Sequence, residues 1–464
     1  MTSIDPTVSG RALEKFFGRM DASGARLHCV IVYQNGKRLL QFAAEPYRCD
    51  DKRELYSLSK SFTSTAIGVL YDRGLVELGM PILSIFPEYA ACAEQDPRWA
   101  RMQIKHALCM STGHASCVFP QMSHGDDSVR AFFTSPLQYE PGDVFTYNTG
   151  ATCLLAAAVK RLCGQTVPEL LAETVFRDMG IDTFNWKKCV DGSCQGGAGL
   201  ALSCEDIVKL GLLYQNHGRW NGRQVLSDEW INLATSKQMH NENNGTADWC
   251  SGYGFQFWRN HREGYRADGA FGQVCAVLPE RGLVMALMAE TGDMCSELNY
   301  AWNFLDELQT GTEACSITPA WAYKPLGGLS SDPMDTDWRQ MEQNAAGIVA
   351  LRLQKDGQCA TLSFLTDSGV QQLRAFADVW SEQTLTLREF MPTLHQMMPR
   401  HVPQEMRMSV SAGTINDETV FDVAMRNTPH AFQIHVGLAG NRLTMKLQSP
   451  LDVFTAEKLL REKR

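Results

Sequence analysis

The chain has 464 residues, of which 44% are hydrophobic and 20% are charged. That composition supplies core material for two folded domains and excludes an extended disordered protein. The formal net charge of −9 excludes the strongly basic surface that non-specific binding to nucleic acid or anionic lipid requires.

Neither a membrane segment nor a secretory leader is expected from the hydropathy pattern. The first residues, MTSIDPTVSGRALEKFFGRM, lack a basic stretch followed by a continuous apolar run, and no apolar run elsewhere reaches membrane-spanning length. We therefore predict a cytoplasmic protein with no membrane and no nucleic-acid partner.

Cysteine usage agrees with a reducing compartment. There are 15 cysteines, an odd number, and they include no CxxC pair. The closest spacing, Cys189 and Cys194, is a weak metal signal, so we predict reduced core thiols and neither a metal nor an organic cofactor.

In chain order, the first predicted elements are a helix and a hairpin. Residues 11–22 place apolar side chains at helical spacing, and residues 27–45 form two apolar runs around Asn35-Gly36, a strong hairpin signal. From Ser57 to about residue 215 the pattern is mainly helical, with one helix ending at Gly164.

Strand patterns return in residues 252–258 and 272–290, followed by a helix near residues 296–309. Strands at both ends with helices between them imply one sheet assembled from distant segments. We therefore predict an α+β fold of the α/β sandwich type, in which an antiparallel sheet is flanked by helices.

The amino-acid composition changes after this region. The stretch GTEACSITPAWAYKPLGGLSSDPMDTD is rich in Pro, Gly, Ser and Thr and predicts a linker. Beyond it, stretches that alternate apolar and polar residues are broken by Asp-Gly, Asn-Asp and Gly-Asn turns. We predict a catalytic domain over residues 1–312, a linker over 313–340 and a small antiparallel β domain over 341–464.

One short stretch, ELYSLSKSFTSTAIG, sets Lys60 three positions after Ser57. Residues three apart share a helix face, so the two side chains can meet. A serine hydroxyl needs an adjacent base to act as a nucleophile at neutral pH, and a lysine desolvated among apolar groups can lose its proton and serve. The pair is therefore a candidate for nucleophilic catalysis.

Further motifs follow in order. The stretch YSLSKSFTSTAIGVLYDRGLVELGMPI resembles the nucleophile helix of the penicillin-binding-protein-like serine hydrolases, in the branch of class C β-lactamases, family VIII esterases and D-amino-acid peptidases. PGDVFTYNTGATCLLAAAVKRLCG is similar to the family's Tyr-x-Asn motif, and IKHALCMSTGH resembles its His-Leu-Leu segment. GGAGLALSCEDIVKLGLLY and YRADGAFGQVCAVLPERGLVMAL occupy the places of its Gly-Gly loop and its third motif. The resemblance covers about residues 8–312.

This resemblance implies a role for each part. Ser57 attacks a carbonyl carbon, while Lys60 and Tyr147 share protons as general base and acid. A phenolate at Tyr147 would need the positive charge of Lys60 nearby. The backbone N–H groups of Ser57 and Ala270 would form the oxyanion hole.

Departures from the family pattern bear on the substrate. The second motif reads Tyr147-Asn148-Thr149, so threonine stands at the usual asparagine position unless Asn148 takes that role. The third motif begins with Ala267 in place of a lysine or histidine that helps hold a substrate carboxylate, and this change with Asp268 beside it disfavours β-lactam hydrolysis. The predicted pocket residues are Thr149, Asn148, Ala267, Asp268, Gly269 and His114.

We predict a serine hydrolase that cleaves an ester or amide of a small molecule or peptide through an acyl-enzyme on Ser57. Three alternatives stay open: a D-amino-acid peptidase or amidase whose C-terminal domain shapes the pocket, a catalytically inactive binding protein with the same fold, and a β-lactamase. The sequence assigns neither the substrate nor the oligomeric state.

Overall fold

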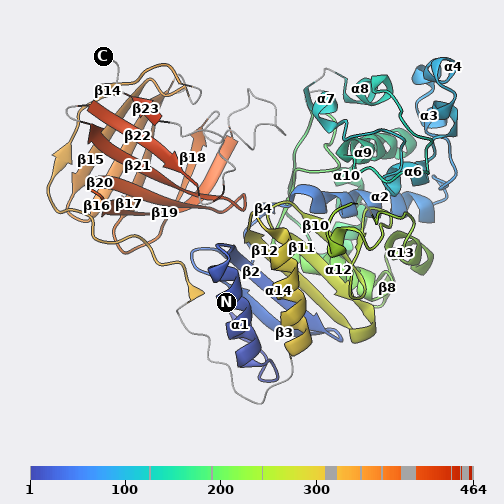
Figure 1. Ribbon diagram of the computed structural model, residues 1–464, viewed down its shortest axis with the longest axis horizontal. Helices are drawn as coiled ribbons and strands as arrows, with labels where there is room; N and C mark the ends of the chain where they lie inside the picture. The colour runs from blue at the N-terminus through green and yellow to red at the C-terminus, as the bar shows by residue number, and fades with distance from the viewer. Residues whose placement is uncertain are drawn as a thin grey trace. The chain divides into compact units, whose positions relative to one another are not determined.

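The computed structural model describes residues 2–124, 127–189, 192–242, 244–308, 321–344, 347–366, 369–387, 404–439, 442–449, 451 and 459–461 (Figure 1). The chain divides into two compact units. Unit 1 comprises Met1–Phe42, Glu54–Ala289 and Asp293–Ser316, and unit 2 comprises Ala43–Arg53, Glu290–Gly292 and Ile317–Arg464. Two short segments from the first 300 residues therefore belong with the C-terminal unit.

Unit 1 is built on a seven-stranded sheet that joins the two ends of the unit. The strands, in spatial order, are β1 (Ser3–Ile4), β3 (Lys37–Ala43), β2 (Arg26–Gln34), β12 (Leu283–Glu290), β11 (Gln273–Leu278), β10 (Tyr265–Gly269) and β9 (Trp258–Arg259). Neighbours β9, β10, β11 and β12 pair antiparallel, as do β1 and β3. The predicted antiparallel sheet from distant segments is confirmed.

The centre of this sheet is covered on both faces. Every residue of β11 and β12 is buried, in keeping with the continuous apolar runs of these strands. At the predicted hairpin, Asn35 and Gly36 have φ values of 49° and 78°, the left-handed pair that a tight two-residue turn requires.

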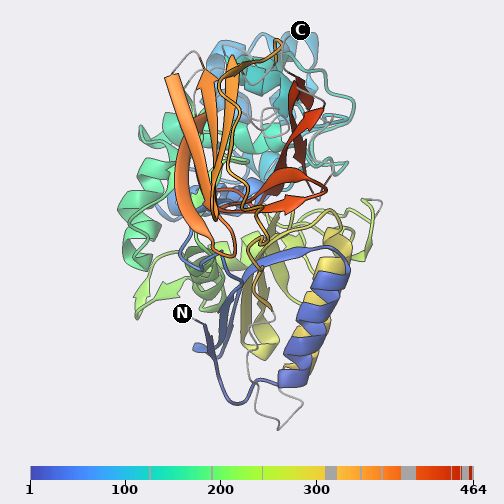
Figure 2. The ribbon, with the colours of Figure 1, turned by 90° about the vertical axis from the view of Figure 1, so that its left-hand side faces the viewer.

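Helices surround the sheet and form a second layer of unit 1. They are α1 (Gly10–Ala22), α2 (Ser59–Asp72), α3 (Ile82–Ile85), α4 (Cys92–Gln95), α5 (Arg98–Arg101), α6 (Ile104–Leu108), α7 (Phe119–His124), α8 (Ser128–Thr134), α9 (Thr149–Cys163), α10 (Val167–Leu171), α11 (Arg177–Met179), α12 (Cys204–Gln215), α13 (Asp228–Thr235) and α14 (Met294–Glu307). Helices α1 and α14 lie side by side in both views (Figures 1 and 2), with Phe16 stacked on Phe304 at 5.0 Å.

Short elements complete unit 1. The 3-10 helices are η1 (Tyr56–Leu58), η2 (Pro87–Tyr89), η4 (Ala247–Trp249) and η5 (Pro279–Arg281), and η3 (Ala172–Phe176) is a π-helical turn. The minor strands are β4 (Arg53–Glu54), β5 (Asn185–Trp186), β6 (Leu200–Leu202), β7 (Arg219–Trp220) and β8 (Arg223–Gln224).

Helix α2 lies in the interior of unit 1. Residues Ser59 to Leu70 are all buried, including the polar ones, so this helix has no solvent-facing stripe over its first three turns. Helix α9, its neighbour, ends as predicted at Gly164, which caps it with φ 78°. The buried α2 carries the predicted nucleophile segment at its N-terminal end.

The strand predicted over residues 252–258 is wrong except at its last residue. Gly252 and Gln256 have positive φ values of 111° and 65°, which interrupt an extended chain, and only Trp258 enters a strand. The alternating aromatic residues instead contact other rings: Phe255 lies 5.8 Å from Trp230, and Phe257 lies 4.7 Å from Tyr214.

Unit 2 is an antiparallel β structure of two larger sheets. One sheet contains β13 (Met334–Asp335), β14 (Arg339–Gln340), β15 (Ala350–Asp356), β16 (Cys359–Thr366) and β17 (Gly369–Phe376). The other contains, in order, β18 (Ser381–Leu387), β19 (Gln404–Ile415), β20 (Glu418–Met425), β21 (Ala431–Ala439), β22 (Arg442–Gln448) and β23 (Leu459–Arg461). Side chains of both sheets share one apolar core, exemplified by Leu362, Phe364, Phe421 and Ile434.

A buried ion-pair cluster joins distant segments of unit 2. Arg426 follows β20, and its guanidinium donates to both carboxylate oxygens of Asp51, at 3.0 and 3.1 Å from Nε. Arg53 donates to the same carboxylate at 3.0 Å, and all three side chains are at most 4% exposed. This cluster fixes residues 43–53 within unit 2.

Two chain-wide features bear on the sequence predictions. Every described cysteine is a free thiol. Within the described ranges, no helix combines the length and the apolar character needed to cross a membrane. The predicted linker over 313–340 begins outside the described residues, and from residue 321 its described part is mostly irregular, with β13 and β14 near its end.

Candidate active site

Ser57 lies in η1, one turn before the buried helix α2 begins. Tyr56 before it has φ 48°, a rare conformation for a tyrosine that turns the chain sharply at this point. Lys60, in the first turn of α2, donates from Nζ to the Ser57 hydroxyl at 3.0 Å and to the Gly197 carbonyl at 2.8 Å. The helical spacing thus brings the two predicted side chains into direct contact.

The environment of Lys60 favours its neutral form. The side chain is 2% exposed, and among the described residues no carboxylate forms an ion pair with it. Burial lowers the pKa of Lys60 to about 8, although the charge of Asp268 opposes the shift. With this pKa, about a tenth of Lys60 is an uncharged amine at pH 7, able to accept a proton, and that fraction grows as the pH rises.

Tyr147 completes the cluster. The Lys60 ammonium lies 4.9 Å from the centre of the Tyr147 ring, and that ring stacks on Trp258 at 5.3 Å. Burial raises the pKa of Tyr147, Asp268 raises it further, and a hydrogen bond with Ser57 lowers it in part. The phenol therefore keeps its proton, in contrast to the phenolate that the resemblance allowed.

The third motif passes close to the nucleophile turn because Gly269 has no side chain. A Cβ at Gly269 would lie 2.0 Å from the Leu55 carbonyl oxygen and 3.0 Å from the Leu58 nitrogen. Next to it, Phe271 has φ 66° and packs edge-on against Tyr56 at 5.1 Å. This close approach brings the chain at Ala270 beside η1.

Strand alternation separates the residues of the third motif. Arg266 and Asp268 lie on one face of β10, and Ala267 lies on the other. The Arg266 Nε donates to Asp268 at 2.9 Å, and its Nη1 donates to Asn260 at 3.2 Å. Burial raises the pKa of Asp268, and the Arg266 charge opposes that shift. The motif therefore carries an internal ion pair.

Asn148 and Thr149 stand at the start of α9. Asn148 is the N-cap: its side-chain oxygen accepts from the Gly150 nitrogen at 3.0 Å and from the Val118 nitrogen at 3.1 Å. Thr149 lies against Gly197, because a Cβ at that glycine would be 2.6 Å from the Thr149 methyl carbon. Thr149 thus adjoins the residue whose carbonyl accepts from Lys60.

His114 lies in a buried aromatic cluster. Its ring is 4.7 Å from Phe132 and 5.7 Å from Trp99, and its Nδ1 lies 2.9 Å from the Thr112 hydroxyl. Burial lowers the pKa of His114 to about 4. The ring is therefore neutral near pH 7.

Two contributors to this cluster were not singled out from the sequence. The Trp258 ring stacks on the Tyr147 ring. The Gln256 side-chain amide donates to the Leu108 carbonyl and accepts from the Thr152 hydroxyl. The backbone carbonyl of Gln256 accepts from the Ser61 hydroxyl. Both belong to the aromatic run at residues 252–258, where alternation indicated only a strand. A glutamine at positive φ leaves no such signal in a sequence.

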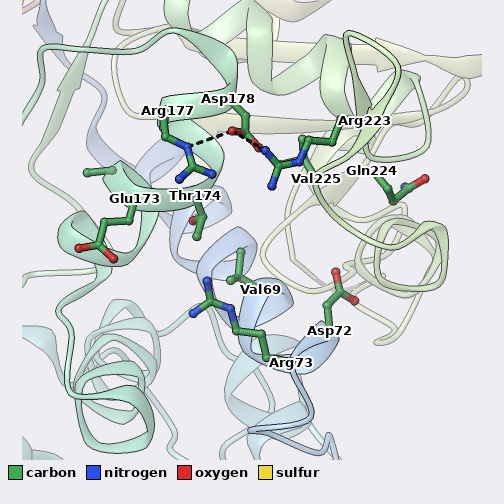
Figure 3. A pocket seen from close by; sticks show the side chains of 11 residues that line it. Val69, Asp72, Arg73, Glu173, Thr174, Arg177, Asp178, Arg223, Gln224 and Val225 are labelled. Carbon is green, nitrogen blue, oxygen red and sulfur yellow. Dashed lines mark hydrogen bonds and ion pairs between the residues drawn. The ribbon is translucent and has the colours of Figure 1, made fainter.

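The described residues contain no group of three or more His, Cys, Asp or Glu side chains arranged to hold a metal ion. A pocket of about 680 Å³ lies at the other end of α2 (Figure 3). There Arg177 and Arg223 both contact Asp178, and none of the predicted site residues lines it.

The side chains of Ser57, Lys60 and Tyr147 form one cluster in unit 1, and the family match identifies the protein as a serine hydrolase. A model of the Beta-lactamase family matches residues 13–307, and the chain belongs to that family. The matched region corresponds closely to unit 1.

Known proteins resemble the chain over different extents. The 6-aminohexanoate-dimer hydrolase of Paenarthrobacter ureafaciens is 24% identical over 284 residues, 57% of this chain and 72% of that protein. The crystal structure of a family VIII carboxylesterase matches with a TM-score of 0.53 and 15% identity, over 66% of this chain and 98% of the other.

A third match extends beyond unit 1. The octameric penicillin-binding protein homologue from Pyrococcus abyssi matches with a TM-score of 0.52 and 14% identity, over 97% of this chain and 99% of that one. The likeness at this identity concerns the fold, and it includes the C-terminal β structure.

Proposed function

We propose that this hydrolase cleaves an ester or amide bond of a small molecule or peptide through an acyl-enzyme on Ser57. The observation that carries the proposal is the 3.0 Å contact between the Lys60 amine and the Ser57 hydroxyl, in a setting that lowers the pKa of Lys60 to about 8. The ester-cleaving and amide-cleaving names of the compared proteins support both substrate classes.

In the first step, the Ser57 oxygen attacks the substrate carbonyl carbon and its proton passes to neutral Lys60. The carbonyl oxygen becomes an oxyanion, which we assign to the backbone N–H groups of Ser57 and Ala270. The support for this assignment is the close approach of Gly269 to η1, which places Ala270 next to the nucleophile turn.

In the second step, the bond to the leaving group breaks and the leaving alkoxide or amine takes a proton. Tyr147 is protonated before this step, and its ring contacts both Lys60 and Trp258. We therefore assign to Tyr147 the donation of a proton to the leaving group. Lys60 replenishes Tyr147. Water then attacks the acyl-enzyme and gives a proton to Lys60; as the bond between the acyl group and the Ser57 oxygen breaks and the acid is released, Lys60 passes that proton to the Ser57 oxygen.

The wider setting of this function also stays a proposal. The free thiols support a cytoplasmic location, where glutathione and thioredoxin keep cysteines reduced. Thr149, Ala267, Asp268 and Gly269 stay proposed pocket residues, and a separate β domain over residues 341–464 stays a proposal as well.

The test is intact mass spectrometry of the wild type and Ser57→Ala after incubation with a fluorophosphonate and, separately, with a p-nitrophenyl ester. A mass increase confined to the wild type is expected. Folding of both proteins is checked by circular dichroism. No adduct on folded wild-type protein would reject the hydrolase mechanism and favour a binding protein with the same fold.

A further inference from the structure

We propose that Asp268 neutralises Arg266 beside the catalytic cluster and thereby makes the site select uncharged acyl groups over acyl groups that carry a carboxylate. This inference rests on the proposed function and names its substrate class. It assigns to Asp268 a role in specificity and to Arg266 the role of a masked cation.

Arg266 and Asp268 form a buried ion pair. They project from the same face of β10, two residues apart, with Arg266 Nε 2.9 Å from the Asp268 carboxylate. The Arg266 side chain is 0% exposed and that of Asp268 is 5% exposed. Of the pair, only the Asp268 side chain retains accessible surface.

Arg266 is held in place by several groups, and among the described residues its ion-pair partner is Asp268. Its guanidinium lies 5.0 Å from the Trp249 ring and 6.0 Å from the Trp258 ring, and it donates to Asn260. Its Nη2 has no hydrogen-bond partner among the described residues. Since a guanidinium is a permanent cation, the Asp268 carboxylate is the group that compensates it within the described part of the chain.

The pair adjoins the reacting groups. Trp258, which contacts Arg266, stacks directly on Tyr147, and the charge of Asp268 influences the pKa of both Lys60 and Tyr147. Removing the Asp268 charge would therefore change the electrostatic potential where the substrate acyl group sits.

The charge balance decides which substrates fit. Because Arg266 is paired with Asp268, this arginine offers no uncompensated charge to a substrate carboxylate. Glu297, a further buried acid near Asp268, has its pKa raised to about 8, mainly by burial, and is therefore mostly protonated at neutral pH. An acyl group with its own carboxylate meets the Asp268 carboxylate and gains nothing from the masked Arg266.

The test compares two esters with the same six-carbon acyl chain, p-nitrophenyl hexanoate and mono-p-nitrophenyl adipate, on wild type and Asp268→Asn. The asparagine keeps the shape and an oxygen acceptor for Arg266 but removes one negative charge. We expect wild type to favour the neutral ester in kcat/KM, and the ratio of neutral to anionic ester to fall by about tenfold in Asp268→Asn.

Asp178→Asn is the matched control. It also removes one carboxylate from an arginine pair, but Asp178 adjoins the residues around Val69 and Asp72, roughly 18 Å along α2 from Ser57. Its ratio of kcat/KM values should equal that of wild type. Spontaneous hydrolysis of each ester is subtracted with Ser57→Ala.

This inference would be overturned if the wild type preferred the adipate ester, or if the ratio of kcat/KM for the neutral ester to that for the anionic ester were unchanged in folded Asp268→Asn. In either case, turnover of the hexanoate ester would still uphold the proposed function. No turnover of either ester and no fluorophosphonate adduct would reject both.

Discussion

The two units bury charged side chains to a similar degree but for different ends. In unit 1, Lys60 is 2% exposed and bonds to a hydroxyl and a carbonyl, with no carboxylate in direct contact among the described residues. In unit 2, Arg426 is 4% exposed and shares the Asp51 carboxylate with Arg53. Lys60 is therefore buried without an ion-pair partner among the described residues, whereas Arg426 is buried together with one.

The difference teaches what an uncompensated buried charge can do. A buried cation with a carboxylate partner stays charged and ties segments together, as residues 43–53 are tied to β20. A buried cation without one is pushed toward its neutral form, which for Lys60 lowers the pKa to about 8. Reactivity in unit 1 and cohesion in unit 2 thus follow from the presence or absence of a counter-ion.

The largest effect is expected from Lys60→Met, which removes the uncompensated amine. Without a base, kcat/KM for a p-nitrophenyl ester should fall by about 10³-fold or more. The measurement is steady-state kinetics, with the exposed Lys105→Met as control. Turnover at the wild-type rate in Lys60→Met would contradict the assignment of Lys60 as the base.

The same variant should be more stable than wild type near neutral pH. The pKa of Lys60 falls from its ordinary value of 10.5 to about 8, so the unfolded chain binds more protons between these values and stability rises with pH across that window. Below it, burial of Lys60 costs on the order of 3 kcal/mol. Denaturant unfolding of wild type and Lys60→Met against pH would show the slope in wild type alone.

Arg426→Ala tests the compensated cluster. It leaves the Asp51 carboxylate buried with fewer partners, so a loss of about 3–5 kcal/mol is expected. Because two units can unfold separately, the readout is hydrogen exchange of peptides from β19 to β21.

Arg352→Ala is the control for that loss, because it breaks a pair with Asp335 that is partly exposed to solvent. Its effect should stay within about 1 kcal/mol. Equal losses of stability in Arg426→Ala and Arg352→Ala would show that burial does not increase the contribution of the Asp51 ion pairs to stability.

Gly269→Ala tests how far the reactive cluster depends on its backbone. The added Cβ meets the Leu55 carbonyl oxygen at 2.0 Å, and since backbone atoms occupy that space, η1 or β10 must shift. A shift of this kind should lower kcat by about 10²-fold. Gly18→Ala, in α1 with open space around it, should retain wild-type kinetics.

The smallest effect is the pH dependence of the wild type. Since neutral Lys60 is the active form, kcat/KM for a neutral ester should rise about tenfold per unit of pH below about 8 and level off above it. A profile that is flat or falls as pH increases from about 7 to 9 would contradict the role of Lys60 as base.

Much of unit 1 was predictable because its signals are local. The first helix, the Asn35-Gly36 hairpin, the cap at Gly164 and the final helix of the unit each depend on residues close together in the chain. The contact between Ser57 and Lys60 belongs with them, because three-residue spacing on one helix is sufficient to produce it.

Other features depend on residues far apart. The run at residues 252–258 alternates like a strand, yet Gln256 adopts a positive φ because it bonds to three different helices at once. Likewise, the sequence at residues 267–269 showed only that the usual lysine or histidine is absent from the motif. In the structure, alternation along β10 puts Arg266 and Asp268 on the same face, where they form an ion pair.

By itself, the sequence predicted the contact between Ser57 and Lys60, the order of the motifs, and a mixed α/β part followed by a β-rich part, because these follow from local spacing, turn residues and apolar periodicity. Only the tertiary structure decided that Lys60 has no ion-pair partner among the described residues, that Tyr147 stacks on Trp258 and that Asp51 belongs with Arg426. Burial and charge pairing arise between distant segments, so a pKa such as that of Lys60 is fixed only when the chain has folded.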